Sequence, residues 1–159
     1  MHVEPSNEHE WLAKLAGEWK FEHDCEEPGK EPVKLRGKES VRMLGDLWMV
    51  GEGEGEMPGG GVARSIMTLG FDPAKGKFVG SFIASMMTHF WPYEGTLDDS
   101  GKVLTLDSEG PSFAGDGSMA KYRDSIELVS DDHRILRSRV LGSDGAWTEF
   151  MVSHYRRVG

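Results

Sequence analysis

Alternating apolar and polar residues, broken by one short turn, occupy positions 69–97 and constrain the fold more than any other stretch. The turn, at 72–76, contains proline and glycine, and alternation resumes at Lys77. Proline presets φ and glycine tolerates positive φ, so this pattern is typical of a β-hairpin. The more apolar face of the second strand is predicted to point into the core, and it carries Phe78, Gly80, Phe82, Ala84 and Met86.

The same two-residue period begins at Glu18 and continues almost to the end of the chain. Segments rich in Gly, Pro, Asp and Ser interrupt it, among them the predicted loops at 26–30 and 110–118. We expect about ten strands, near 18–25, 33–43, 47–56, 63–71, 77–86, 89–97, 103–107, 120–129, 134–141 and 146–155.

The predicted connections are too short to contain the crossover helices of a parallel sheet. Sequential antiparallel pairing is therefore the simplest topology. Closing such a sheet into an up-and-down barrel removes its exposed edges. We predict an all-β, up-and-down antiparallel barrel of about ten strands.

The chain suits one domain, 1–159, because 159 residues bury roughly 70% of their unfolded surface on folding. We expect an N-terminal helix at 6–16 and the barrel at 17–157. The helix places Trp11, Leu12 and Leu15 on one face. A helix this short is marginal in water by itself, so it is predicted to dock over one open end of the barrel.

Composition and charge exclude several classes of partner. The net charge of −9 opposes nucleic-acid phosphates and anionic lipids, and the basic residues alternate with acids instead of forming a patch. No apolar run approaches the roughly 20 residues of a spanning helix, and the first residues lack the pattern of a secretory signal. The single cysteine, Cys25, agrees with a reducing compartment. We expect a cytoplasmic protein that binds neither nucleic acid nor membrane.

No motif in the chain carries a defined reaction. The six histidines lack the close paired spacing that directs two imidazoles at one metal ion. The chain has no G-x-S-x-G or Walker sequence, and the Gly-Glu repeat at 51–55 precedes no predicted helix and would repel phosphate. We therefore predict neither a metal nor a cofactor, and favour a protein without catalytic activity.

Three polar residues lie on the otherwise apolar faces of their predicted strands: His23, Glu39 and Asp124. Burying any of them requires a hydrogen-bonding partner. The favoured interpretation is a satisfied hydrogen-bond network in the core. The alternative is that they recognise a ligand inside the barrel.

A second candidate set follows the hairpin, at His89, Trp91 and Tyr93. One interpretation is a strand buried against the N-terminal helix. The other is an aromatic wall beside a cavity, with a polar tip for a ligand. Phe82 and Met86, on the predicted inward face of the preceding strand, are the remaining candidate ligand-binding residues. The flexible thioether of Met86 would let a pocket adapt its shape.

Several short segments together resemble one family: 15–19 (LAGEW), 69–72 (LGFD), 76–80 (GKFVG), 85–86 (SM), 94–98 (EGTLD) and 101–104 (GKVL). They are similar to the bacterial domain-of-unknown-function family DUF1579, whose members are calycin-like (lipocalin/fatty-acid-binding-like) barrels. The resemblance implies the fold and says little about chemistry. Members often carry an acid where this chain has Ala84, so a reaction built on that acid is excluded here.

The triplet Gly17-x-Trp19 is also similar to the calycin signature. That resemblance implies that Trp19 closes the barrel base and that a late arginine packs over it. Arg156 is the predicted match, with Arg157 as the neighbouring alternative.

Three functions remain open at this stage. The leading one is a non-catalytic barrel that binds a small apolar or amphipathic ligand. The second is a barrel filled by its own side chains that serves as a scaffold or as a homodimer through Trp48 and Val50. The third is a haem-binding barrel with His89 as the axial ligand, because His154 shares a strand face with Arg156 and not with the core.

Overall fold

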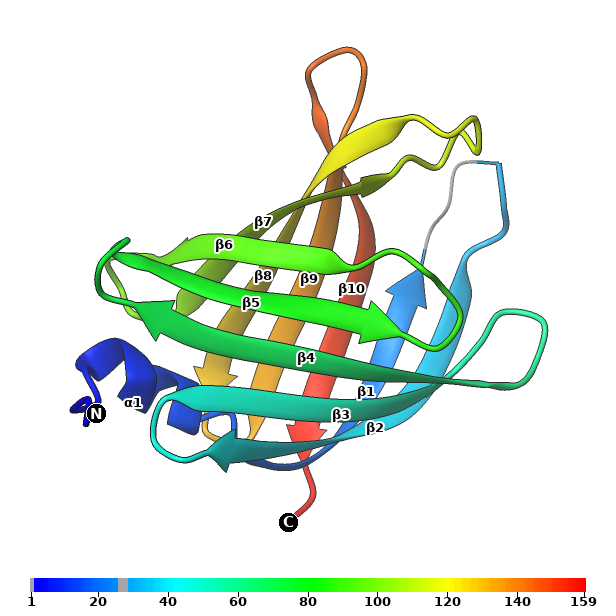
Figure 1. Ribbon diagram of the computed structural model, residues 1–159. Helices are drawn as coiled ribbons and strands as arrows, with labels where there is room; N and C mark the ends of the chain where they lie inside the picture. The colour runs from blue at the N-terminus through cyan, green and yellow to red at the C-terminus, as the bar shows by residue number, and fades with distance from the viewer. Residues whose placement is uncertain (1, 26–28) are drawn as a thin grey trace.

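The computed structural model describes residues 2–25 and 29–159, so the predicted loop at 26–30 lies largely outside the described residues. Ten antiparallel strands form a closed barrel in which each strand pairs with its sequence neighbours and β1 pairs with β10 (Figure 1). The elements are α1 Asn7–Ala13, β1 Gly17–Cys25, β2 Val33–Leu44, β3 Trp48–Glu56, β4 Val62–Asp72, β5 Lys77–Ala84, β6 Trp91–Leu97, β7 Val103–Pro111, β8 Met119–Ser130, β9 His133–Leu141 and β10 Trp147–Arg157. The predicted fold class and strand order are confirmed.

Element boundaries differ from the sequence-based expectation in several places, and β5 ends at Ala84 instead of 86, which leaves Met86 outside the strand. The helix ends at Ala13 instead of 16, and the next residues form i+3 turns in which the amides of Leu15 and Ala16 donate to the carbonyls of Leu12 and Ala13. Strand β6 begins at Trp91, two residues later than expected. Strand β7 continues to Pro111, because its last residues pair with the start of β8 at Met119.

Helix α1 covers one end of the barrel, which we call the closed end (Figure 1). The side chains of Trp11 and Leu12 are buried there. The Trp11 indole N–H donates to the carbonyl of Gly101 at 2.7 Å, and His9 Nε2 is 3.1 Å from the carbonyl of Phe71. These contacts join a helix too short to be stable alone to β4 and to the β6–β7 turn.

The opposite end of the barrel, the open end, carries the β5–β6, β7–β8 and β9–β10 loops (Figure 1). Inward-facing residues near the closed end, such as Leu69 and Leu104, are fully buried. Those towards the open end, such as Phe82 and Met151, are only partly buried. Among the described residues, no helix is long and apolar enough to cross a membrane.

Candidate functional site

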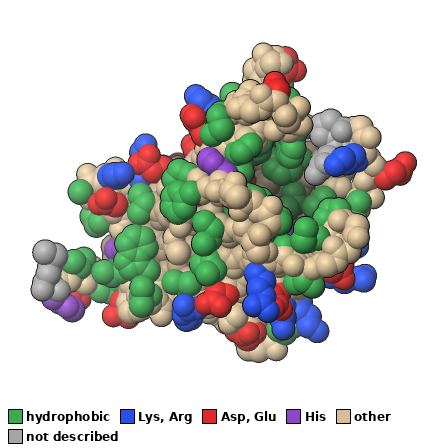
Figure 2. Space-filling view, turned by 45° about the vertical axis from the view of Figure 1, so that its right-hand side comes forward, with side chains coloured by type: hydrophobic (Ala, Val, Ile, Leu, Met, Phe, Trp, Pro, Cys, Tyr) green, Lys and Arg blue, Asp and Glu red, His purple; other side chains and the backbone are tan. Residues whose placement is uncertain are grey.

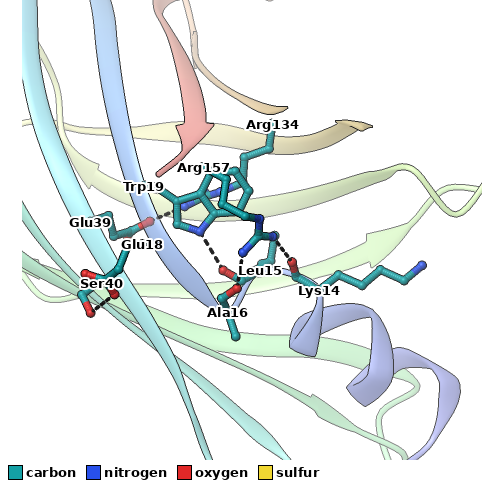
Figure 3. Close-up of polar contacts among 9 residues, drawn as sticks. All are labelled: Lys14, Leu15, Ala16, Glu18, Trp19, Glu39, Ser40, Arg134 and Arg157. Carbon is teal, nitrogen blue, oxygen red and sulfur yellow. Dashed lines mark hydrogen bonds and ion pairs between the residues drawn. The ribbon is translucent and has the colours of Figure 1, made fainter. Parts of the chain in front are cut away.

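A stack of aromatic rings and guanidinium groups seals the closed end (Figure 3). The Trp19 ring lies between the guanidinium of Arg134, at 4.7 Å, and that of Arg157, at 4.3 Å. Its indole N–H donates to the carbonyl of Leu15 at 2.9 Å. Cation–π contacts of buried rings contribute about 2 kcal/mol each, so this stack has a structural role.

The prediction that Arg156 packs over Trp19 is wrong. Arg156 is exposed, whereas Arg157 shares the inward parity of Tyr155 and reaches the ring. Gly17 makes room for it, because a Cβ at this position would lie 2.2 Å from Arg157 Nη1. Arg157 also donates to the carbonyls of Lys14 and Ala16, which fixes the linker between α1 and β1.

Glu39 is buried, as its strand parity predicts, and forms an ion pair with Arg134 (Figure 3). The guanidinium of Arg134 also lies 3.9 Å from the ring of Tyr155. Glu39 therefore belongs to the closed-end stack. The sequence analysis did not predict Arg134 as an interior residue. Its position two residues before Leu136 on β9 places it on the same, inward face.

Asp124 lies on the inward face of β8 and accepts a hydrogen bond from the Tyr93 hydroxyl, with 2.6 Å between the oxygens. Ser138, on β9, also hydrogen-bonds Asp124. Burial raises the pKa of the Asp124 carboxyl, and these two hydrogen bonds oppose that rise. Burial and the nearby Asp124 charge raise the pKa of the Tyr93 hydroxyl, which keeps Tyr93 a donor.

His23 faces inward on β1, and its ring packs against Phe21 with 4.4 Å between ring centroids. Its Nδ1 is buried and has no hydrogen-bond partner among the described residues. Burial lowers the pKa of His23 from 6.5 to about 4, so the imidazole is neutral near neutral pH. Of the three predicted polar residues, His23 is the one with a free buried polar atom.

The predicted polar set does not form one network. Glu39 pairs with Arg134, Asp124 pairs with Tyr93, and His23 stacks on a phenylalanine. The interpretation as satisfied core groups fits Glu39 and Asp124. It leaves His23 unexplained.

Aromatic rings gather at the open end in a group that we call the mouth cluster, made of Trp91, Phe113, Tyr122 and Phe150. Edge-to-face contacts join Trp91 to Tyr122 at 5.0 Å and Phe113 to Phe150 at 5.0 Å. Trp91 lies across Gly110 of β7, where a Cβ would come within 2.1 Å of its ring. The alternation in β6 indicated Trp91, but the other rings of the cluster, from the β7–β8 loop, β8 and β10, come together only in the closed barrel.

His89 does not lie against the N-terminal helix. It precedes β6 in the β5–β6 loop, where its ring contacts Trp91 with 4.7 Å between centroids. Met86, in the same loop, is exposed, whereas Phe82 faces inward and pairs in register with Trp91. The aromatic-wall interpretation thus describes the position of Trp91 better than burial under the helix does.

Figure 2 shows a hollow at this end of the barrel, among hydrophobic side chains. Strand parity directs five side chains inward in the half of the barrel nearer the open end, and we call the space between them the open-end chamber: His23, Phe82, Trp91, Tyr122 and Met151. Phe82, Trp91 and Met151 are only partly buried, although their strand positions point inward. The chamber is therefore reached from solvent through the open end.

A separate groove of about 650 Å³ lies over β1–β5, lined mainly by outward-facing residues and also by Glu39, Ser65 and Ala84. Charged side chains line much of it, and they pair with one another: Lys38 lies 3.6 Å and Arg64 3.3 Å from Glu54. Ser40 donates to Glu18 at 2.7 Å. This groove has few polar groups left for a ligand.

The two histidines considered for haem are both engaged. His154 lies outside the barrel, with its Nδ1 3.0 Å from His133 Nε2. The Nε2 of His89 is 2.8 Å from the carbonyl of Glu109. Among the described residues, no group of three metal-ligating side chains is placed to hold an ion. These positions do not favour an axial ligand.

Comparison with solved structures shows the fold. Rv2717c from M. tuberculosis is similar with a TM-score of 0.71 at 13% identity, covering 98% of this chain and 100% of that one. An S-type phycobiliprotein lyase, CPES, from Guillardia theta has a TM-score of 0.59 at 13% identity, covering 98% and 99%. A de novo designed fluorescence-activating β-barrel has a TM-score of 0.51 at 14% identity, covering 92% and 96%.

No curated protein matches the chain. A sequence profile described as a protein of unknown function matches residues 4–157, which is nearly the whole chain. The predicted resemblance is confirmed by this match. The protein belongs to the DUF1579 family.

Proposed function

We propose that this barrel binds a small apolar or amphipathic molecule in its open-end chamber and does so without chemical turnover. The observation that carries the proposal is the chamber itself, which combines partly buried inward-facing apolar residues with the unpartnered Nδ1 of His23. Concave apolar sites with a few convergent polar groups are the usual form of small-molecule sites. A phycobiliprotein lyase and a fluorescence-activating design share the fold, which agrees with ligand binding without specifying a ligand.

Native mass spectrometry of the freshly purified protein, together with titration by the uncharged dye Nile red, tests this proposal. We expect a co-purified mass or saturable dye binding at one site per chain. The proposal is refuted if the spectra show no co-purified mass and if dye binding does not saturate at dye concentrations up to its solubility limit. The same spectra would also show the mass of a dimer, which is expected if the chain instead forms a homodimer through Trp48 and Val50.

A pair of neighbouring substitutions locates the site. Met151 faces inward on β10 and helps to define the chamber, whereas Val152, the next residue, faces outward. Met151→Trp fills space inside the chamber and is expected to weaken dye binding at least tenfold, whereas Val152→Trp is expected to leave it unchanged. Far-UV circular dichroism checks that both variants fold. Equal binding by both folded variants would place the dye elsewhere.

A further inference from the structure

Two histidines from neighbouring strands meet on the outer face of the barrel. His133 is the first residue of β9, and His154 lies on β10, 21 residues further along the chain. The Nε2 of His133 and the Nδ1 of His154 are 3.0 Å apart, and the planes of the two rings differ by 25°. Spacing in the sequence gave no sign of this pair, because it is the pairing of β9 with β10 that brings the two residues together.

The distance between these two nitrogens matches that between two imidazoles bound to one metal ion. A metal–imidazole bond is about 2.0–2.1 Å long. Two nitrogens bound at a right angle therefore lie about 2.9 Å apart, and two bound at a tetrahedral angle lie about 3.3 Å apart. The 3.0 Å in this pair is nearer to the right angle, which is the arrangement that Cu²⁺ and Ni²⁺ adopt with nitrogen and oxygen ligands.

The protonation state of the pair also suits a metal ion, which binds neutral imidazole. In the hydrogen bond one ring donates its N–H and the other accepts with a lone pair. The donor ring provides the second lone pair when its proton moves to its other nitrogen, and this change of tautomer leaves the charge unchanged. Burial and the nearby charges of Arg156 and His154 lower the pKa of His133, which favours its neutral form.

One arginine and two acids surround the pair. Arg156 is the register partner of His133, and it is exposed, so its long side chain can turn into solvent. Glu22 is the register partner of His154 on β1, and the charge of Glu127 on β8 acts on His133. These two acids offset the arginine charge. Both histidines are only partly buried, so water can reach an ion held between them.

We propose that His133 and His154 together bind one divalent ion on the outer wall of the barrel, Cu²⁺ or Ni²⁺ in preference to Zn²⁺. Water completes the coordination, because no group of three metal-ligating side chains is placed to hold an ion in the part of the chain that the structure describes. The bound ion joins β9 to β10. Both side chains face away from the open-end chamber, so this site is independent of the proposed function.

Thermal unfolding of the full chain with Ni²⁺, followed by far-UV circular dichroism at neutral pH in a buffer that does not bind metals, tests the site. An ion held by two strands binds the folded chain more tightly than the unfolded chain and therefore stabilises it. At a Ni²⁺ concentration about tenfold above the dissociation constant, we expect the melting temperature to rise by about 3–6 °C. Mg²⁺, which prefers oxygen ligands, is expected to leave it unchanged.

Three single variants assign the effect. His133→Ala and His154→Ala are each expected to abolish the rise, because one imidazole alone cannot bridge the two strands. His2→Ala is the matched control, since His2 is exposed near the amino terminus, where an ion would not join parts of the fold. We expect the full rise in this variant. Melting temperatures without metal show that each variant folds, and if one of the two site variants does not fold, the other decides.

Several results would overturn the inference. The first is an unchanged melting temperature of the natural chain as Ni²⁺ is raised to millimolar concentrations. The second is a rise that persists in His133→Ala or His154→Ala, or that disappears in His2→Ala, because the ion then binds elsewhere. A larger rise with Zn²⁺ than with Ni²⁺ at equal concentration would overturn the choice of metal. None of these results affects the proposed ligand binding in the chamber.

Discussion

Removing the Glu39 carboxylate is expected to destabilise the barrel strongly. Arg134 is 4% exposed and its guanidinium contacts the rings of Trp19 and Tyr155, so in Glu39→Ala we expect it to stay buried without its partner. Leaving one member of a buried ion pair without its partner costs about 3–5 kcal/mol. For a chain of 159 residues each kcal/mol lowers the melting temperature by about 2–4 °C, so we expect a decrease of about 6–20 °C.

Urea unfolding followed by far-UV circular dichroism measures this free energy. The matched control is Glu127→Ala, which breaks the 2.7 Å pair between Glu127 and Arg137 on the partly exposed outer wall. That change is expected to cost less than about 1 kcal/mol. The double variant Glu39→Leu/Arg134→Met is expected to recover most of the loss, because removing both charges leaves neither unpaired. A cost for Glu39→Ala no greater than that of Glu127→Ala would refute the reasoning.

Three further predictions concern the interior. Burial lowers the pKa of His23 from 6.5 to about 4, so between these pH values His23 is protonated in the unfolded chain but not in the folded chain. The folded state therefore becomes less stable as the pH falls through this window. In urea titrations, the free energy of unfolding should decrease less between about pH 7 and about pH 4.5 in His23→Phe than in the natural chain, by about 2–3 kcal/mol, and an equal decrease in both would contradict this. Gly110→Ala is expected to cost about 1–3 kcal/mol and to alter the near-UV circular dichroism, because the new Cβ would lie 2.1 Å from the Trp91 ring. Tyr93→Phe takes a donor from the buried Asp124 and should cost about 1–3 kcal/mol in thermal unfolding, but distinctly less in an Asp124→Asn background.

The alternation of residues predicted most of the architecture because side chains on a strand have a period of two. It placed Glu39 and Asp124 on inward faces, and both side chains lie inside the barrel. The same parity identifies Arg157 as the inward arginine of β10, since it is in step with Tyr155. The choice of Arg156 came from the resemblance to a signature and ignored that parity.

The sequence did not predict which side chains the inward-facing polar residues contact. Parity states that Glu39 points inward, but 95 residues separate it from Arg134, and only closure of β1 on β10 brings β2 near β9. The mouth cluster likewise depends on the closed barrel, because the contact between Trp91 and Tyr122 joins β6 to β8 across β7. The amino-acid pattern therefore determined the strands, their order and their buried faces, which are local properties. The tertiary structure alone decided which buried polar groups are satisfied and that His23 Nδ1 is not, because hydrogen bonding inside a barrel depends on strands distant in sequence.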